Sequence, residues 1–431
     1  MGDQPAIHAL KERWLLQVAF VTAPLSVIFL GGHVIFTPHA MYHHWGGDFV
    51  DFWTGARLLL QGRIFEIFDP LSFRHAMRAM VPPGYFPSSL PYPPSYFPLI
   101  VWTGLMSVPT ALTVWTFLGV AALLGAAWPL SRSPWVAIAI LLSPAAAVSL
   151  DIGQNGLFTA ALIIGGLRLV DRKPWIAGAL LGLATFKPQL GLLIPVALLA
   201  AGRWRVIAGA AASAAALAGV GTLLTGTEAW ILFLTRALPF QRTLLETGDV
   251  GQGLAMTPSL VIAGHSSGLP LSTALSIQAI VSLACMAAVF LWFRRVRLEK
   301  RRIGGLDILM LVTAGFLAAP YAFAYDMPVI VVALVLACAD HPWLDDQVAW
   351  RWGLVLLWIA PIVMWVVGLS PVHGEGQHWY GAGALMLIAG VALIALGSRG
   401  AWPQKTGSAA RKAVGEVLPD AAGLWLPGGV L

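Results

Sequence analysis

The chain has 431 residues, of which 58% are hydrophobic and only 11% are charged, and its formal net charge is +6. Soluble globular proteins carry about 25% charged residues. This composition therefore excludes an ordinary soluble enzyme and predicts an all-α polytopic membrane protein, because only helices and closed barrels span a bilayer. The basic residues form short clusters between apolar runs, which argues against nucleic acid as a partner.

The first apolar run, residues 14–36, is too long for a signal-peptide core and has no small-residue cleavage site after it, so we expect a retained first helix. Lys11 and Arg13 precede it, and the positive-inside rule puts them in the cytoplasm. The same rule assigns to the cytoplasm the basic clusters at 172–173, 203–205 and 294–302. We therefore expect a cytoplasmic N-terminus (1–13), a transmembrane domain (14–397) with two long external loops (37–94 and 225–270), and a cytoplasmic tail (398–431).

The transmembrane domain is predicted to hold about 10–12 helices. After the first loop, apolar segments lie at 96–106, 110–130, 134–149, 157–170, 175–185, 190–201, 206–224, 271–293, 307–319, 327–339, 352–367 and 379–396. For the basic clusters all to lie in the cytoplasm, residues 96–130 must cross the membrane an odd number of times, although they look like two segments. Several segments are shorter than a full span, and short pairs interrupted by polar motifs are typical of half-helices around a buried site.

The first loop begins with two carboxylates three residues apart, Asp48 and Asp51, between glycines and aromatics. Apolar residues at helical spacing predict an amphipathic helix over 51–61 that lies at the membrane interface. Asp48 is either the cap of this helix or a general base that takes a proton from an acceptor hydroxyl. Asp51 either contacts substrate or only supports the helix.

Two polar motifs interrupt the apolar runs in the middle of the chain. The 151–156 motif contains Gln154 and Asn155, whose amides hold sugar hydroxyls or a phosphate unless the motif is an ordinary turn. Lys187 and Pro188 interrupt the run 174–201, where an ionisable residue is costly and suggests function. Lys187 either binds a lipid phosphate as a point charge or extends to the interface.

Further candidates lie in the last third of the chain. In the 320–326 break, Tyr321 is a hydrogen-bond donor to substrate, and Asp326 either caps the next helix or pairs with a buried cation. Arg236 and Arg242 in the second loop are candidate phosphate ligands. The two cysteines sit in apolar runs without metal-ligand spacing, so we expect buried thiols, no disulfide, no metal and no cofactor.

The order of these motifs resembles the polyprenyl-phosphate-mannose-dependent mannosyltransferases of glycosyltransferase family 87, bacterial members of the GT-C superfamily. The resemblance spans about residues 14 to 396 and is carried by Asp48-Phe49-Val50-Asp51-Phe52-Trp53, Ala56-Arg57-Leu58-Leu59, Gly62, Tyr92-Pro93-Pro94, Gly153-Gln154-Asn155, Lys187-Pro188, Pro320 and Tyr325-Asp326.

The resemblance implies a GT-C fold in which the first external loop carries the catalytic aspartate and a lipid-phosphate sugar donor enters from the membrane. The family's Asp-hydrophobic-x-x-aromatic pattern falls on Asp48, Phe49 and Phe52, and its phosphate-contacting lysine falls on Lys187. Relatives often carry histidine after the late Ser-Pro, where this chain has Tyr321 after Pro320.

The resulting prediction is an inverting glycosyltransferase of the bacterial inner membrane that moves a hexose, mannose by the resemblance, from a polyprenyl-phosphate donor to a lipid or glycan acceptor at the periplasmic face. The predicted site is Asp48 as base, Lys187, Arg236 and Arg242 as phosphate ligands, and Asp51, Gln154, Asn155, Tyr321 and Asp326 as substrate contacts. A secondary transporter or lipid flippase is the alternative, since broken helices and a mid-membrane lysine fit it too. A non-catalytic scaffold is a third. Sugar transfer in detergent, without a sealed compartment, discriminates among them.

Overall fold

The computed structural model describes residues 14–36, 46–81, 85, 88–247, 256–369 and 380–397. Helices make up 81% of it, and the described residues contain no strand, so the all-helical prediction is confirmed. The first helix, α2 (Trp14–Phe36), has the predicted bounds. The cytoplasmic segments expected at 1–13 and 398–431 lie outside the described residues.

Among the described residues, three helices are long and apolar enough to cross a membrane by themselves: α7 (Val108–Ala126), α13 (Trp204–Thr225) and α17 (Leu271–Leu298). The pair α8 (Pro134–Leu141) and α9 (Pro144–Asp151) makes a fourth candidate with a bend of 59°. Seven further apolar helices are shorter. The described residues thus form a polytopic membrane protein, and the predicted 10–12 helices are reached only by including the short ones.

Residues 96–130 contain a single long helix. One crossing in this region agrees with the odd number that the positions of the basic clusters require. The first part forms α6 (Phe97–Ile100) and a 3-10 turn, Val101–Leu105, both too short to span. Only α7 follows, and Ser107 accepts a hydrogen bond from the backbone of Thr110 at its start.

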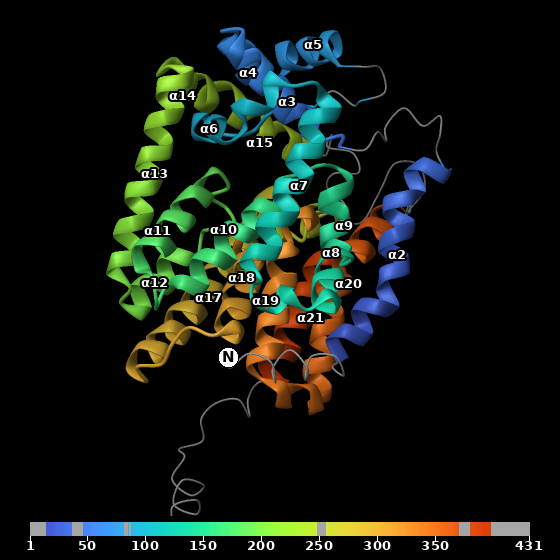
Figure 1. Ribbon diagram of the computed structural model, residues 1–431, viewed down its shortest axis with the longest axis vertical. Helices are drawn as coiled ribbons and strands as arrows, with labels where there is room; N and C mark the ends of the chain where they lie inside the picture. The colour runs from blue at the N-terminus through green and yellow to red at the C-terminus, as the bar shows by residue number, and fades with distance from the viewer. Residues whose placement is uncertain are drawn as a thin grey trace, which may run out of the picture.

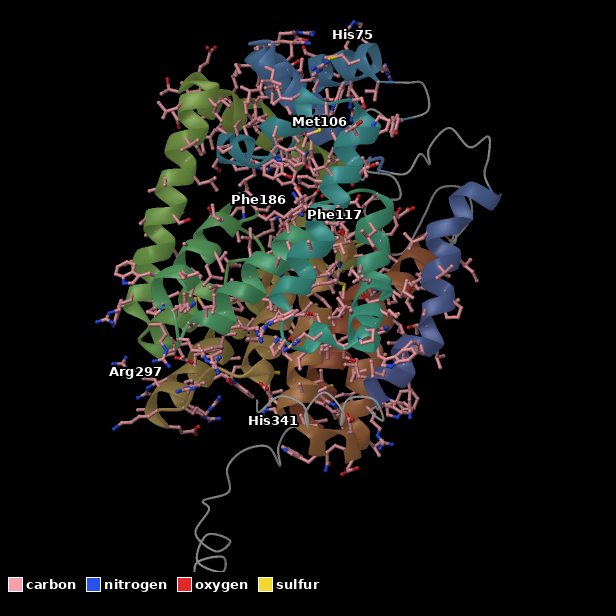
Figure 2. All side chains as sticks on the ribbon, in the orientation of Figure 1. His75, Met106, Phe117, Phe186, Arg297 and His341 are labelled. Atoms are coloured by element: carbon pink, nitrogen blue, oxygen red, sulfur yellow. The ribbon has the colours of Figure 1, made fainter. Side chains whose placement is uncertain are left out.

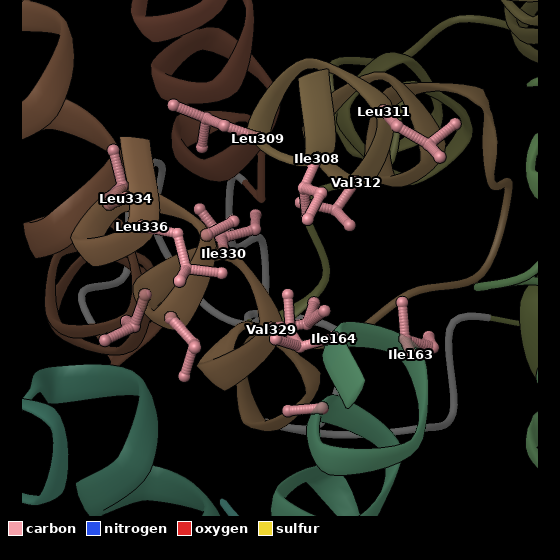
Figure 3. Close-up of a cluster of buried hydrophobic side chains, with 14 of the residues drawn as sticks. Ile163, Ile164, Ile308, Leu309, Leu311, Val312, Val329, Ile330, Leu334 and Leu336 are labelled. Carbon is pink, nitrogen blue, oxygen red and sulfur yellow. The ribbon is translucent and has the colours of Figure 1, made fainter. Parts of the chain in front are cut away.

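A large buried apolar cluster lies at the centre of the bundle. The residues labelled in Figure 3 come from three of the helices that contribute to it. These are α10 (Gly156–Leu169), α18 (Gly305–Ala318) and α19 (Pro328–Asp340). Every residue of α19 from Pro328 to Cys338 is buried. An apolar helix whose surface is buried all round belongs to the interior rather than to the lipid face, so α19 lies inside the bundle, where it packs mainly against α18 and α10.

The remaining helices complete the bundle (Figure 1). They are α11 (Pro174–Leu183), α12 (Ile194–Ala201), α16 (Leu260–Ser266), α20 (Val348–Leu369) and α21 (Ala382–Gly397). A Cβ added at Gly353 of α20 would lie 3.0 Å from the Gly390 carbonyl of α21. Small residues thus let these two helices approach closely, as is common in membrane bundles.

The two long loops predicted from the sequence meet at one end of the bundle, which we call the capping end. It is the upper end in Figure 1 and holds α3 (Phe49–Leu60), α4 (Ile64–Phe68), α5 (Pro70–Met80), α6, α14 (Glu228–Leu232) and α15 (Leu238–Thr247). The rings of Phe68 and Phe233 lie 6.3 Å apart, and Arg236 pairs with Asp69 at 2.8 Å. A second apolar cluster therefore joins the two loops.

The helix predicted over 51–61 is α3, but it is not the half-exposed interfacial helix that its pattern suggested. Ten of its twelve residues are buried. The backbone of the turn at Gly104 packs against Ala56, and Arg57 donates to the Gly104 carbonyl at 2.7 Å. Residues after Tyr92 therefore cover the face that was expected to meet lipid headgroups.

The basic clusters gather at the end of the bundle opposite the capping end. Figure 2 shows Arg297 and His341 at this end and His75 at the other. Asp171 pairs with Arg203 at 2.6 Å and accepts from the Ile303 backbone at 2.8 Å, so one carboxylate ties three connecting turns together. The charge clusters assigned to one side of the membrane thus lie on one side of the fold.

Candidate active site

Asp48 is held by the turn that follows α9. Gly46 and Asp48 donate backbone hydrogen bonds to the carbonyls of Asp151 and Ile152 at 2.8 and 2.9 Å. Gly153 has φ +70°, and a Cβ there would lie 2.7 Å from the Cβ of Phe49. The close approach of the two segments therefore requires glycine at 153.

The Asp48 carboxylate points across this junction. Asp48 occupies the N-cap position of α3, yet its side chain makes no capping hydrogen bond. Instead, its Oδ2 accepts from the amide Nε2 of Gln154 at 2.9 Å. The structure thus brings together two predicted site residues that stand 106 positions apart.

The environment of Asp48 suits a carboxylate that exchanges a proton. Burial raises the pKa of Asp48, and the Gln154 hydrogen bond and the Lys187 charge lower it by less. The residue as a whole is nevertheless only partly buried. A raised carboxyl pKa brings the group closer to the operating pH, where general bases work best.

Asp51 has a different environment, although it lies only one turn further along α3. It is 7% exposed, its Oδ1 has no hydrogen-bond partner, and Ser88 bonds to the carboxyl group. Burial and then the nearby Asp48 charge raise the pKa of Asp51 well above its usual value. Asp48 therefore ionises more readily than Asp51, a division of roles typical of paired acids.

Asn155 begins α10 and is completely buried against two tyrosines. Its Nδ2 donates to the hydroxyl oxygens of Tyr92 and Tyr96 at 3.1 and 2.9 Å. The two rings stack with centroids 4.2 Å apart, and Phe52 meets both edge-on. Sequence reasoning assigned no role to either tyrosine; the available signal was their four-residue spacing across Pro93 and Pro94.

Lys187 and Asp326 form a buried ion pair beside the rings of Tyr92 and Tyr325. Nζ of Lys187 lies 2.6 Å from Oδ1 of Asp326, and the side chains are 3% and 0% exposed. The ammonium lies 4.8 Å from the ring centroid of Tyr325 and 5.9 Å from that of Tyr92. Lys187 therefore does not extend to the membrane interface. Asp326 pairs with a buried cation, which is one of the two roles that the sequence allowed for it.

A tight backbone contact places this ion pair beside Asn155. A Cβ at Gly156 would overlap the carbonyl of Tyr325, so only glycine allows α10 to start there. Phe186 marks the level of Lys187 in Figure 2, between the two ends of the bundle. The helix breaks that contain Asp48, Asn155, Lys187 and Asp326 therefore meet around one buried group of polar side chains, which we call the polar centre.

The remaining predicted residues lie on the capping end. Tyr321 donates to Oε1 of Gln241 at 3.3 Å, and Gln241 in turn donates to Ser89 at 3.3 Å. Arg236 is 47% exposed, pairs with Asp69 and lies over the ring of Phe65. Arg242 is exposed on α15. The structure thus places the arginines on the surface, and their phosphate role stays a prediction.

An apolar groove opens next to the polar centre, between α7 and α10. It is shallow, and the cavity that it encloses measures only about 10 Å³. Its lining includes Trp115, Leu157 and Phe158, with Gln154 at its polar side. A recess of this size holds about one water molecule, so it marks apolar surface beside Gln154 rather than a formed ligand pocket.

The comparisons with known proteins give one finding. A family model described as Glycosyltransferase family 87 matches residues 90–320, more than half of the chain. The match includes Asn155, Lys187 and Pro320, whereas Asp48 and Asp326 lie outside it. No curated protein and no solved structure matches the chain.

Proposed function

Because the chain belongs to glycosyltransferase family 87, we propose that this membrane glycosyltransferase moves a hexose, mannose in the first instance, from a polyprenyl-phosphate donor to a lipid or glycan acceptor. Asp48 is the general base of the proposal. The observation that carries it is the position of the Asp48 carboxylate, hydrogen-bonded to Gln154 and within the electrostatic influence of Lys187.

The proposed reaction is a single displacement with inversion at the anomeric carbon. The acceptor hydroxyl gives its proton to the Asp48 carboxylate as its oxygen attacks that carbon. The bond from the anomeric carbon to the phosphate oxygen breaks, and its electron pair leaves with the lipid phosphate. Stabilisation of such developing charge by groups already in place is commonly the largest catalytic effect.

Lys187 is the proposed partner of the departing phosphate. An ammonium group has three donor hydrogens, and the Asp326 hydrogen bond uses one of them. The ion pair holds Nζ in place and leaves hydrogens for a phosphate oxygen. Arg236 and Arg242 are proposed as outer phosphate contacts, with Asp51, Tyr321 and Asp326 as supporting substrate contacts.

The periplasmic side of a bacterial inner membrane is proposed for the site. The clusters around Arg297 and Arg203 lie at the end opposite the capping end. Cytoplasmic segments of membrane proteins carry an excess of lysine and arginine, so the capping end and Asp48 face outward. The groove between α7 and α10 offers apolar surface for a prenyl chain.

The test uses the purified full-length protein in detergent with polyprenyl-phosphate mannose and a lipid extract as acceptor. Wild type is expected to transfer the sugar without a sealed compartment, which a transporter or flippase does not do. Asp48→Asn should lose transfer while keeping the unfolding temperature of wild type. Asp346→Asn, at an exposed position, is the matched control with normal transfer. Near-normal turnover by Asp48→Asn would remove Asp48 from the role of base.

A further inference from the structure

The trio of Asn155, Tyr92 and Tyr96 has more hydrogen-bond donors than it uses. The amide has two donor hydrogens and one acceptor oxygen, and each phenol has one donor hydrogen. In the structure the amide hydrogens go to the two phenol oxygens. The two phenol hydrogens are then left over, and Oδ1 of Asn155 is buried without a partner.

Turning the amide around does not remove this surplus. Amide orientation is assigned from the surrounding bonds rather than observed directly. With oxygen and nitrogen exchanged, the phenols would donate to the amide oxygen, and the two amide hydrogens would be left over instead. In either orientation, two donor hydrogens of the trio are left without an acceptor, on the two phenols or on the Asn155 amide. Unsatisfied buried groups cost stability and call for an explanation.

The phenols remain donors at any physiological pH. Burial raises the pKa of Tyr92 and of Tyr96 above that of a free phenol. Their rings are also fixed in place, because Tyr96 packs against Phe186 at 5.0 Å and Phe52 meets both rings. The donors are therefore pre-positioned, which reduces the entropy lost when a ligand binds.

Unused acceptors lie close to these donors. Oδ2 of Asp326 has no hydrogen-bond partner, and the charges of Asp326 and Asp48 both act on Tyr92. A second anion at the phenols would be repelled by these carboxylates. A sugar hydroxyl, by contrast, is neutral and both donates and accepts, so it matches a site with leftover groups of both kinds.

We propose that Tyr92 and Tyr96, held by Asn155, bind hydroxyl groups of the transferred hexose. This subsite rests on the proposed function and extends it to two residues that position the sugar between Asp48 and Lys187. Lys187 lies over the Tyr92 ring, on the side where the phosphate is proposed. All three side chains are buried, and Tyr92 is the least buried of them, at 7% exposed against 1% for Tyr96 and 0% for Asn155.

The test pairs single-oxygen deletions in the protein with single-oxygen deletions in the sugar. Tyr92→Phe, Tyr96→Phe and the control Tyr380→Phe are each assayed in full-length protein with polyprenyl-phosphate mannose and its monodeoxy analogues. Should wild type prefer glucose, the glucose series is used. Each substitution keeps the aromatic ring, and the unfolding temperature reports whether the variant folds.

Wild type is expected to lose about tenfold or more in kcat/KM with at least one deoxy donor, since a site built to bond a hydroxyl rejects the analogue without it. In Tyr92→Phe or Tyr96→Phe the parent donor should lose a similar factor, and the matching deoxy donor should then react as fast as the parent. Tyr380→Phe should discriminate as wild type does.

Two outcomes would overturn the subsite while leaving the proposed function intact. One is a wild type that transfers the sugar but treats all deoxy donors alike. The other is full discrimination retained in both tyrosine variants. A wild type that transfers no hexose from any polyprenyl-phosphate donor would instead overturn the proposed function, and the subsite with it.

Discussion

Nζ of Lys187 lies 2.6 Å from Oδ1 of Asp326, although 139 positions separate the two residues in the chain. Both side chains are buried. The pair connects the break after α11 to the break before α19, and the Lys187 charge lowers the pKa of Asp48. The same contact therefore links two helix breaks and also belongs to the proposed site.

The first prediction concerns the stability of this pair. Lys187→Met should destabilise the protein by about 3 to 5 kcal/mol, because it leaves the Asp326 carboxylate buried without a counter-charge. The double variant with Asp326→Leu should recover much of that loss without recovering transfer. Unfolding titrations in detergent measure both effects.

A surface pair provides the control for that measurement. Arg63 and Glu66 pair at 2.6 Å but are 40% and 29% exposed, so Arg63→Met should cost well under about 1 kcal/mol. Equal stability of Lys187→Met and wild type would show that the buried pair is not a structural tie.

The second prediction is a pH shift in a Gln154→Leu variant. The base form of Asp48 is required, and the hydrogen bond from Gln154 lowers the pKa of Asp48, which burial has raised. Without that bond the pKa rises further, so activity should disappear at a higher pH as the medium is acidified. The acid limb of the kcat/KM profile measures the shift, and Gln347→Leu, at an exposed position, serves as control. An unmoved limb in Gln154→Leu contradicts Asp48 as the titrating base.

The third prediction separates the two carboxylates of the first loop. Burial and the Asp48 charge raise the pKa of Asp51 well above its usual value, which favours the neutral carboxyl, and a neutral carboxyl resembles an asparagine amide. Asp51→Asn should keep most of the transfer activity that Asp48→Asn loses. Comparable losses in the two variants would assign the base role to both carboxylates or to neither.

The raised pKa of Asp51 also predicts that the stability of the protein depends on pH. A group whose pKa is raised by folding stabilises the protein below its unfolded pKa, and this contribution is lost as pH rises through the folded pKa. The free energy of unfolding of wild type should therefore fall relative to Asp51→Asn as the pH rises from the ordinary carboxyl pKa of about 4 towards the raised one. Parallel pH curves would show that Asp51 titrates normally.

The fourth prediction uses two glycines with the same backbone conformation. Gly153 and Gly62 both have φ +70°, but a Cβ at Gly153 meets Phe49, whereas nothing lies within 4 Å of a Cβ at Gly62. Both alanine variants carry a strain of roughly 1 to 2 kcal/mol, and only Gly153→Ala should also displace Asp48 and reduce kcat. Equal activity in the two variants would mean that the 46–49 segment tolerates the displacement.

The fifth prediction asks whether Arg236 does more than pair with Asp69. If it contacts the donor phosphate, Arg236→Ala should raise the KM for the lipid donor with little change in kcat. Asp69→Asn frees the guanidinium and should leave that KM unchanged or lower it. A similar rise in the donor KM of both variants would show that the Arg236–Asp69 pair only links the two loops at the capping end.

Composition and local pattern determined the class of this protein. An apolar chain interrupted by Asp48, by Asn155, by Lys187 and by Asp326 predicts a helical membrane protein with a polar centre, because each helix must satisfy its own backbone bonds in lipid. The order of these motifs also indicated the family, and the family match confirms it. Helix bounds such as those of α2 followed from hydropathy alone.

Only the tertiary structure decided which polar groups meet. The bonds from Gln154 to Asp48, from Asn155 to Tyr92 and from Lys187 to Asp326 join residues that stand 106, 63 and 139 positions apart. Local periodicity reports which face of a helix is apolar and carries no information about the segment that will cover it. The burial of α3 has the same origin: the turn at Gly104 covers it, and that contact depends on how the whole chain packs.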